Sequence, residues 1–416
     1  MPEHARPSSR HRLGLLWTLY FVQGVPFGFQ TTALLVYLRE SGISLTTIGL
    51  TSVLALPWML KFLWAPLVDR FSSNRRGRRR SWILPLQIAL ALACAAGALA
   101  DPASHLGPLL ALVFVMNLCA ATLDIAVDGL AVDLLSVGEL GKGNIAQVVG
   151  FKVGMLTGGG LLVWASAFIG WRGLFVAMAA LVTASLAVTL RFREPPLPDA
   201  TERGEPTFRR IFGTVKKALT ARGAVWLLLF VATYKLGESM ADTMFRPFLV
   251  DSGFSREQIG LWLGTWGMLF SIAGSTVGGY LASRLPILSA LSIAATLRVV
   301  PLAALWWLAA SGATAAGVIT VTCAEHFFGG ALTTSLFAFM MSRIDRRVGA
   351  THYTLLAALE VWGKLSAQSV SGLIADKTSY VFVFGLAAAI SLAFLGLLPT
   401  LRWTARPAGV TTAAGR

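Results

Sequence analysis

Three aspartates lie within residues 117–135, NLCAATLDIAVDGLAVDLL, a stretch that is otherwise apolar enough to cross a membrane. Asp124 and Asp128 are four residues apart, so on a helix they project from the same face. A carboxylate inside hydrocarbon costs at least about 2.5 kcal/mol, so it normally faces a cavity or a partner. This pair therefore predicts a polar pathway that uses charge or protons. The alternative is that Asp133, and with it Asp128, lies near the helix mouth and only caps or pairs there.

Two further ionisable residues lie in apolar segments without an oppositely charged neighbour in the sequence, Lys152 and Glu325. Each needs a distant partner, solvent or a substrate. Burial disfavours the charged form of a carboxyl group. We therefore expect Glu325 to take part in proton coupling with Asp124 and Asp128, and Lys152 to bind a substrate carboxylate.

The apolar segment 224–250 carries four charged residues along one helical stripe. Neighbouring members can neutralise one another, so one interpretation is a structural ion-pair ladder. The other is a substrate-binding face, on which the basic residue at the end of the stripe binds a substrate carboxylate. The stripe consists of Lys235, Glu238, Asp242 and Arg246, of which the last three join Lys152 as predicted binding residues.

The polar loop that follows the second apolar segment reads APLVDRFSSNRRGRRRS, residues 65–81. An aspartate at the inner end of a helix can accept hydrogen bonds from a neighbouring helix end or pair with arginines. Such contacts would hold the inner side of a transporter closed. We assign Asp69 and Arg70 to this gate, together with Asp133. The other interpretation, a basic loop that only sets topology, accounts for most of the arginines between 75 and 80.

The composition shows which elements must position these residues. The chain has 416 residues, of which 55% are hydrophobic and only 13% charged, with a mean hydropathy of +0.68. Soluble proteins contain roughly 25% charged residues, so the sequence predicts an all-α integral membrane protein. Its apolar segments, long enough for twelve transmembrane helices, fall at about 13–38, 46–68, 82–100, 107–136, 145–169, 171–190, 224–250, 258–283, 287–310, 313–342, 350–375 and 378–401.

These segments divide into two six-helix bundles, 13–190 and 224–401, joined by a hydrophilic linker at 191–223. Within the linker, residues 208–219 are expected to form a surface helix. Short tails, 1–12 and 402–416, complete the chain. With both termini in the cytoplasm, 25 of the 35 Lys and Arg residues lie on the inner side and four on the outer side. This imbalance predicts the N-in, C-in orientation.

The two halves share a sequence repeat. YLRESGISLTTIGL at 37–50 matches FLVDSGFSREQIGL at 248–261, each at the exit of a first helix and the start of a second. A duplicated six-helix unit is typical of transporters with two pseudo-symmetric halves.

Several function classes are excluded or disfavoured. The net charge of +15 lies in alternate loops, as topology requires, and not on a nucleic-acid-binding face. No metal-ligand, serine-hydrolase or nucleotide-binding pattern is visible, so we expect no enzyme activity, no metal and no cofactor. Gly150, Gly154 and Gly158 form a small-residue stripe suited to close helix packing. The expected partners are the lipid bilayer, a small-molecule substrate and protons, and a monomer is expected.

Four stretches resemble the AmpG-type branch of the major facilitator superfamily: YFVQGVPFGF (20–29), LKFLWAPLVDRF (60–71), DIAVDGLAVDLL (124–135) and GFKVGMLTGGGLLVW (150–164). That branch includes bacterial anhydromuropeptide permeases, siderophore importers and eukaryotic acetyl-coenzyme A transporters. The resemblance implies twelve core helices in the superfamily fold, alternating access and coupling to protons. Asp69, Asp124 and Asp128 occupy matching motif positions, and Lys152 stands where muropeptide permeases tend to have Arg. The compact chain looks at least as close to the siderophore importers.

Together these features predict a secondary transporter of the bacterial inner membrane that imports an amphipathic organic solute with protons. Anhydromuropeptides and siderophores are the expected substrate types. The alternatives are a lipid or lipid-linked-substrate flippase and a transporter of the acetyl-coenzyme A type.

Overall fold

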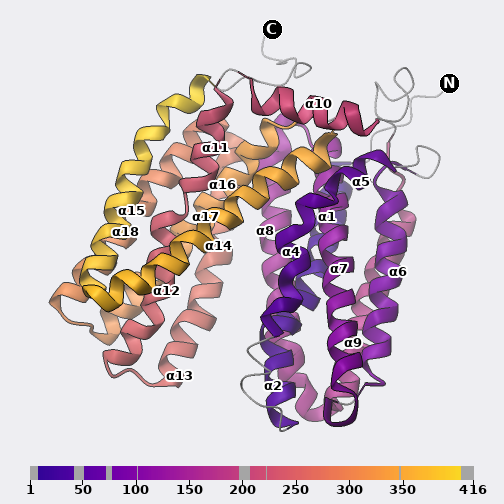
Figure 1. The fold of residues 1–416 in the computed structure, drawn as a ribbon, viewed down its shortest axis with the longest axis horizontal. Coiled ribbons are helices and arrows are strands. Elements are labelled where there is room, and N and C mark those ends of the chain that lie inside the picture. Colours follow the sequence, from indigo (N-terminus) through magenta and orange to yellow (C-terminus); the bar gives the residue numbers. More distant parts are fainter. Residues whose placement is uncertain are drawn as a thin grey trace. The chain divides into compact units, whose positions relative to one another are not determined.

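The computed structural model describes residues 8–41, 51–71, 77–100, 102–195, 207–221, 223–345 and 348–403. These residues form helices joined by short turns, with no strand among them (Figure 1). Each of the twelve predicted apolar segments is helical over most of its described length, which confirms the all-α class. Much of the repeat at 37–50, the arginines at 75 and 76, the linker prolines from 196 to 206 and most of both tails lie outside the described residues.

The chain forms two units. Unit 1 comprises Met1–Leu135, Ala146–Thr214 and Arg346–Thr354, and unit 2 comprises Ser136–Ile145, Val215–Asp345 and Leu355–Arg416. Relative to the predicted bundles, each unit therefore includes a short segment from the other half of the sequence. One is Ser136–Ile145, the connection that leads into the fifth predicted segment, and the other is Arg346–Thr354, which includes the beginning of the eleventh.

Unit 1 is built from long helices and from several shorter 3-10 and π-helical pieces, which are labelled η. Its elements are α1 (Ser9–Gly28), η1 (Phe29–Ala33), α2 (Leu34–Glu40), η2 (Thr51–Ala55), α4 (Leu56–Leu60), η3 (Lys61–Leu63), α5 (Ala65–Arg70), α6 (Arg80–Gly97), α7 (Pro102–Leu134), α8 (Leu140–Leu156), η5 (Thr157–Leu161), α9 (Leu162–Arg191) and α10 (Phe208–Leu219). The first residues of α8 belong to unit 2, and the last residues of α10 do so too.

Unit 2 contains the remaining helices. They are η4 (Val137–Glu139), α11 (Ala224–Thr233), α12 (Leu236–Asp251), α13 (Arg256–Ile259), η6 (Gly260–Trp266), α14 (Gly267–Arg284), α15 (Ile287–Ser311), α16 (Ala315–Ser342), α17 (Gly349–Lys377), α18 (Tyr380–Phe394), η8 (Leu395–Leu397) and η9 (Pro399–Trp403). The first turns of α17 belong to unit 1.

By length and apolar composition, eight helical stretches of the described residues can cross a membrane. One of them, Val137–Arg191, has 55 residues, which at about 1.5 Å per residue is far longer than one crossing of a roughly 30 Å hydrocarbon core. It turns at Gly170, whose φ of 67° is a left-handed conformation that suits glycine. This turn lies between the fifth and sixth predicted segments. The second predicted segment is instead divided into short helices, with Pro57 and Pro66 at the beginnings of two of them. Twelve crossings and the orientation stay predictions.

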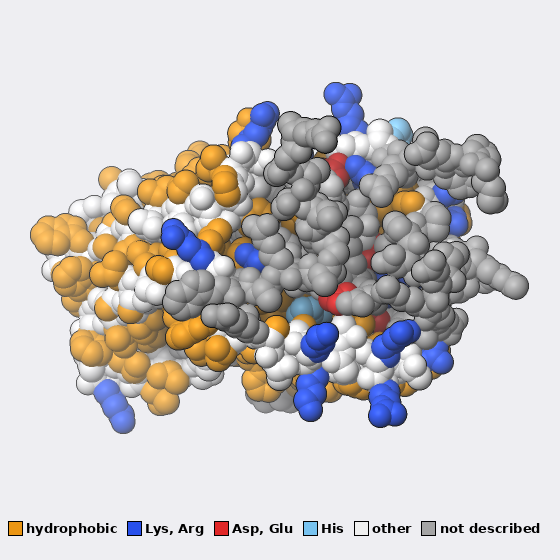
Figure 2. Space-filling view, turned by 90° about the horizontal axis from the view of Figure 1, so that it is seen from above, with side chains coloured by type: hydrophobic (Ala, Val, Ile, Leu, Met, Phe, Trp, Pro, Cys, Tyr) orange, Lys and Arg blue, Asp and Glu red, His pale blue; other side chains and the backbone are white. Residues whose placement is uncertain are grey.

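The linker forms the predicted surface helix, α10, with the predicted bounds. Ile211 is fully buried, while Phe212 and the basic residues of the helix are exposed. The Phe208 ring meets the Phe71 ring edge to face, with centroids 6.0 Å apart. This contact holds the start of α10 at the end of unit 1 where α5 ends (Figure 1). In the view from above, Lys and Arg side chains project from several places on this face (Figure 2).

Glycines bring α1 into backbone contact with α8 and with η5, which continues α8. A Cβ at Gly154 would collide with the carbonyl of Phe21, and one at Gly158 with the carbonyl of Val25. Gly24 approaches the backbone of α8 in the same way. The predicted small-residue stripe is therefore confirmed. In unit 2, a Cβ at Gly363 of α17 would collide with the carbonyl of Ala232 of α11, which is the corresponding contact.

We expect Gly158→Ala to destabilise the protein by about 1–3 kcal/mol, because the added methyl group forces two packed backbones apart. Thermal unfolding of the purified protein in detergent measures the effect. Gly160→Ala is the matched control, since its Cβ would meet only the Leu156 side chain, at 3.5 Å. Equal unfolding temperatures for the two variants would show that the helices separate without cost.

Candidate functional site

The first aspartate of α7 forms an ion pair inside unit 1. The Lys61 ammonium of η3 contacts the Asp124 carboxylate directly. Their side chains are 11% and 10% exposed, so the pair is largely buried. Sequence spacing gives no sign of this contact, because the partners are 63 residues apart. The pair neutralises two charges that would each be costly in hydrocarbon.

Asp128, one turn further along α7, is surrounded by neutral donors. The Tyr20 hydroxyl donates to Asp128 Oδ1 at 2.8 Å, and Gln147 Nε2 donates to the same oxygen at 3.0 Å. Tyr353 donates in turn to Gln147 Oε1 at 3.3 Å, and all four residues are buried. The two aspartates therefore share a face but differ in chemistry, since only Asp124 contacts a cation.

Three aromatic rings of unit 1 gather beside the ion pair. The centroid of Trp58 lies 5.4 Å from that of Phe27 and 5.8 Å from that of Phe151. Lys61 Nζ is 5.7 Å from the Trp58 centroid, a cation–π distance. Trp58 Nε1 donates to Asn117 Oδ1 at 2.9 Å, which fixes the indole ring. All three rings are partly exposed.

A second charged cluster is centred on Arg298 in unit 2. Arg298 is 2% exposed, and its Nε donates to Glu238 Oε2 at 3.2 Å. Its Nη2 donates to the Glu325 carboxylate, and its Nη1 donates to the Glu325 carbonyl at 2.6 Å. His326 Nδ1 lies 2.7 Å from Glu325 Oε2. The distant partner that the sequence requires for Glu325 is therefore Arg298.

The charged stripe of the seventh predicted helix is only partly regular. The helix breaks between α11 and α12, and Lys235 stands at the N-cap of α12 with a non-helical conformation. Lys235 Nζ lies 3.5 Å from Glu238 Oε1, so the first step of the ladder forms. Asp242 instead joins Glu238 and Glu325, with carboxylate oxygens within 4.8 Å of one another. Arg246 is exposed and makes no ion pair within the described residues.

This cluster of carboxylates does not fit a metal ion. Arg298 already donates to two of the three carboxylates and supplies the positive charge that a divalent cation would bring. A broken helix with charged groups at the break is, however, the construction that transporters use for binding sites within the membrane.

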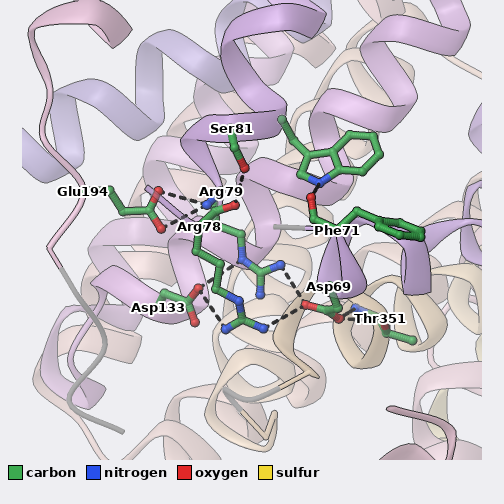
Figure 3. A network of polar contacts seen from close by, with 9 residues as sticks. Asp69, Phe71, Arg78, Arg79, Ser81, Asp133, Glu194 and Thr351 are labelled. Carbon is green, nitrogen blue, oxygen red and sulfur yellow. Dashed lines mark hydrogen bonds and ion pairs between the residues drawn. The ribbon is translucent and has the colours of Figure 1, made fainter. Parts of the chain in front are cut away.

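A third network lies where α5 ends and α6 begins (Figure 3). Arg79 Nη1 donates to Asp69 Oδ1 at 2.7 Å, and Arg79 Nε donates to Asp133 Oδ2 at 3.0 Å. Arg78 Nη2 also donates to Asp69, at 3.2 Å. From the first turn of α17, the Thr351 amide and hydroxyl donate to Asp69 Oδ2 at 2.8 and 2.6 Å. We call these five residues the latch network.

The latch network contains the predicted gate residues Asp69 and Asp133, but the guanidinium of Arg70 lies over the Phe71 ring, 5.4 Å from its centroid. The pairing with a helix end and with arginines is the geometry expected of Asp69, while gating itself stays a prediction. The sequence could not distinguish Arg78 and Arg79 from the other arginines of the loop.

Glu194, which follows α9, binds the beginning of α6. Its carboxylate accepts from the Arg79 amide at 2.9 Å and from the Arg80 amide at 2.9 Å, which satisfies donors that a helix leaves open at its first turn. Burial raises the pKa of Glu194, and the backbone donors oppose that shift. Burial and the neighbouring Arg79 charge lower the pKa of Arg78. Residues 78–80 are therefore held in place by contacts with Asp69, Asp133 and Glu194.

The predicted site residues thus fall into separate groups. Asp124 and Asp128 lie together in unit 1, and Glu238, Asp242 and Glu325 lie together in unit 2. Lys152 is partly buried on α8, next in sequence to Phe151. The partners that complete these groups have no role predicted from the sequence; they are Tyr20, Trp58, Lys61, Asn117, Gln147, Arg298 and Tyr353.

Comparisons with known proteins agree with this architecture. Residues 16–355 match the family described as the Major Facilitator Superfamily. The chain is 32% identical over 398 residues to the anhydromuropeptide permease of Escherichia coli K12, covering 93% of this chain and 79% of the permease. It is 25% identical to putative transporter AmpG 4 of Rickettsia felis, over 84% of this chain and 86% of that protein.

Solved structures share the fold. The E. coli fucose:proton symporter superposes with a TM-score of 0.71 at 14% identity, over 93% of this chain and 98% of that chain. A bacterial homologue of the iron transporter ferroportin, in an outward-facing state, gives 0.70 at 18% identity, over 96% of this chain and 99% of that chain.

Proposed function

Because the chain belongs to the AmpG-type branch of the major facilitator superfamily, we propose that this multi-pass membrane transporter imports an amphipathic organic solute together with protons across a bacterial inner membrane. An anhydromuropeptide is the first substrate to test, since the permease named for it is 32% identical over 93% of this chain. A siderophore is the second. The observation that supports the proposal most directly is the largely buried ion pair of Lys61 with Asp124. Asp124 and Asp128 both lie in α7, which is long and apolar enough to cross a membrane.

Asp124 and Asp128 are the proton-coupling residues in this proposal, with Glu325 in the corresponding role in unit 2. Buried carboxylates within membrane helices are costly, so they are retained where a charge must be gained and lost. Asp128 supports this role through its donors: Gln147 connects it to Tyr353, two residues beyond Thr351 on α17. Loss of the Asp128 charge weakens these bonds and thereby acts on the turn that binds Asp69.

The latch network is the proposed inner gate. Asp69 holds the first turn of α17 through Thr351, and Asp133 helps to place Arg79. The turn is short, and its contacts with Asp69 can be exchanged for water when the inner side opens. Arg70 contributes charge to the same loop.

Substrate binding is assigned to charged residues of both units, each considered by itself. In unit 1, Lys152 follows Phe151 on α8, is partly buried and carries a positive charge for an acidic substrate group. In unit 2, the break before α12 brings Glu238 and Asp242 to the charged cluster, and Arg246 presents an exposed guanidinium further along the helix. We propose a monomer with both termini in the cytoplasm.

Uptake into inverted or right-side-out vesicles, with and without a proton gradient, tests this function. The compounds are an anhydromuropeptide, a ferric siderophore and acetyl-coenzyme A. We expect gradient-dependent accumulation of one compound and a loss of at least about tenfold in the Asp124→Asn/Asp128→Asn variant, because a neutral amide carries no exchangeable charge.

Asp376→Asn, an exposed aspartate near the end of α17, is the matched control and should accumulate substrate normally. Unchanged gradient-driven uptake in the double variant would remove the coupling assignment. If no compound accumulates, the lipid flippase becomes the better interpretation, and transfer of labelled lipid between leaflets would test it.

A further inference from the structure

Lys61 contacts two kinds of group within unit 1. Its ammonium pairs with the Asp124 carboxylate, and it also lies over the Trp58 ring. Both charged side chains keep about a tenth of their surface exposed, so a small ligand or water can reach them. The arrangement is polar at one point and aromatic around it, as expected of a binding site for a small molecule.

The aromatic rings are held in place. The indole nitrogen of Trp58 is fixed by Asn117, whose own amide donates to the Val113 carbonyl at 2.9 Å. Phe27 and Phe151 both meet Trp58 edge to face, with interplanar angles of 79° and 75°, and the Trp58 side chain is partly exposed, so part of the indole is accessible to a ligand. The negative face of an aromatic ring attracts C–H groups that carry partial positive charge. The C–H face of a sugar ring has this property.

We propose that Trp58, Lys61 and Asp124 form a subsite for a sugar-linked carboxylate, in which the substrate carboxylate and Asp124 compete for Lys61. This inference rests on the proposed function and specifies its chemistry. The sugar face packs against Trp58, and the carboxylate forms a charge-assisted hydrogen bond with the Lys61 ammonium.

Competition for one cation couples the substrate to a proton. Lys61 cannot neutralise two carboxylates, so binding of the substrate leaves Asp124 without its partner in a low-dielectric site. A proton from the outer aqueous phase then binds to Asp124, and the total charge of the subsite is preserved. On the inner side, the proton leaves Asp124, the carboxylate pairs with Lys61 again, and the substrate is released.

The groups that act on Asp124 come from several elements. Lys61 of η3 contacts it, Asp128 lies one turn along α7, and the hydroxyl of Tyr20 on α1 is within electrostatic range. Lys152 lies on α8 beside Phe151. Only Lys61 makes a direct ion pair with Asp124 among the described residues. Removal of Asp124 therefore takes away the carboxylate that competes with the substrate, without removing the donors that hold Asp128.

The experiment measures equilibrium binding to the purified full-length protein in lipid nanodiscs from about pH 5 to about pH 8. One probe is an anhydromuropeptide, and the other is the same molecule with its peptide carboxylates converted to amides. For the wild type, we expect the affinity for the acidic probe to fall by up to about tenfold for each unit by which the pH rises, because one proton binds together with one carboxylate. The amide probe should show no such slope.

The variants separate the parts of the subsite. Asp124→Asn should abolish the pH slope and retain tight binding of the acidic probe. Lys61→Gln should weaken the acidic probe by about 10- to 100-fold while leaving the amide probe unchanged. Trp58→Ala should weaken both probes equally, by about threefold to tenfold. Lys61→Arg should retain the preference for the acidic probe.

The double variant Lys61→Gln/Asp124→Asn removes both charges together, so it leaves no uncompensated charge that would prevent folding. It should lose both the slope and the preference for the acidic probe. Glu360→Gln is the matched control, because Glu360 is a buried carboxylate that pairs with the partly exposed Lys364, at 2.9 Å, in unit 2. It should keep the wild-type slope.

The outcomes are distinguishable from those of the uptake assay. A wild-type slope that persists in Asp124→Asn would overturn the competition, even if vesicles accumulate the probe. Equal weakening of both probes by Lys61→Gln would show a structural role for Lys61, and absence of binding to the wild type would overturn the subsite. Failure of gradient-driven uptake, with the pH slope and its variants as expected, would instead reject the proposed transport.

Discussion

Arg79→Met is expected to lower the free energy of unfolding by about 3–5 kcal/mol. The Arg79 side chain is fully buried and donates to both Asp69 and Asp133. Without it, two buried carboxylates share Arg78, which lies 3.2 Å from Asp69 and 3.8 Å from Asp133. The penalty comes from the carboxylates left without compensation, more than from the lost attraction. Thermal unfolding in detergent, compared with the wild type, measures it.

Arg209→Gln on α10 is the matched control, because Arg209 is exposed and forms no ion pair within the described residues. It should unfold within about 0.5 kcal/mol of the wild type. The pair of variants Asp69→Asn and Arg79→Met, made singly and together, gives a further measurement. Because the double variant removes charge from both sides, it should be less destabilised than the sum of the singles. Strict additivity would mean that the two residues do not act on each other.

Much of the fold follows from local features of the sequence. Long apolar stretches can satisfy their backbone hydrogen bonds within a membrane only as helices, so the segments and the class were predictable. Glycines four residues apart predicted a close helix contact but not its partner, α1, and a surface helix was predicted at the position of α10. The boundary predicted between residues 169 and 171 coincides with the turn at Gly170, although the φ of 67° that makes the turn is known only from the structure.

Candidate site residues could be chosen from the sequence one by one, but their partners could not, and the roles assigned to them stay predictions. An aspartate in an apolar segment is conspicuous, whereas its partner can be anywhere in the chain. Asp124 pairs with Lys61 63 residues away, and Asp69 binds Thr351 282 residues away. A prediction from helical spacing assumes a continuous helix, so it could not show that Lys235 stands at the break between α11 and α12. Adjacent residues on a helix point in different directions, so nothing in the sequence indicates that His326 Nδ1 lies 2.7 Å from Glu325 Oε2.

Arg298→Met in unit 2 is expected to be the second strongly destabilising change, by about 3–5 kcal/mol. Arg298 is 2% exposed and donates to Glu238, to the Glu325 carboxylate and to the Glu325 carbonyl. Without it, these carboxylates and Asp242 lie within 4.8 Å of one another. Lys235 and His326 remain as partners, but neither contacts both Glu238 and Glu325 as Arg298 does. Thermal unfolding again provides the measurement.

Glu325→Gln separates charge from packing in this cluster. If uncompensated charge is the cause, adding Glu325→Gln to Arg298→Met should restore part of the stability, because one fewer carboxylate lacks a partner. If lost packing is the cause, the addition should restore nothing. Lys364→Met removes a basic residue whose side chain is 31% exposed, so it should cost clearly less. Equal losses for Lys364→Met and Arg298→Met would contradict the central role of Arg298. A rescue by Glu325→Gln would show that the cluster tolerates a neutral group at 325, as reversible protonation of Glu325 requires.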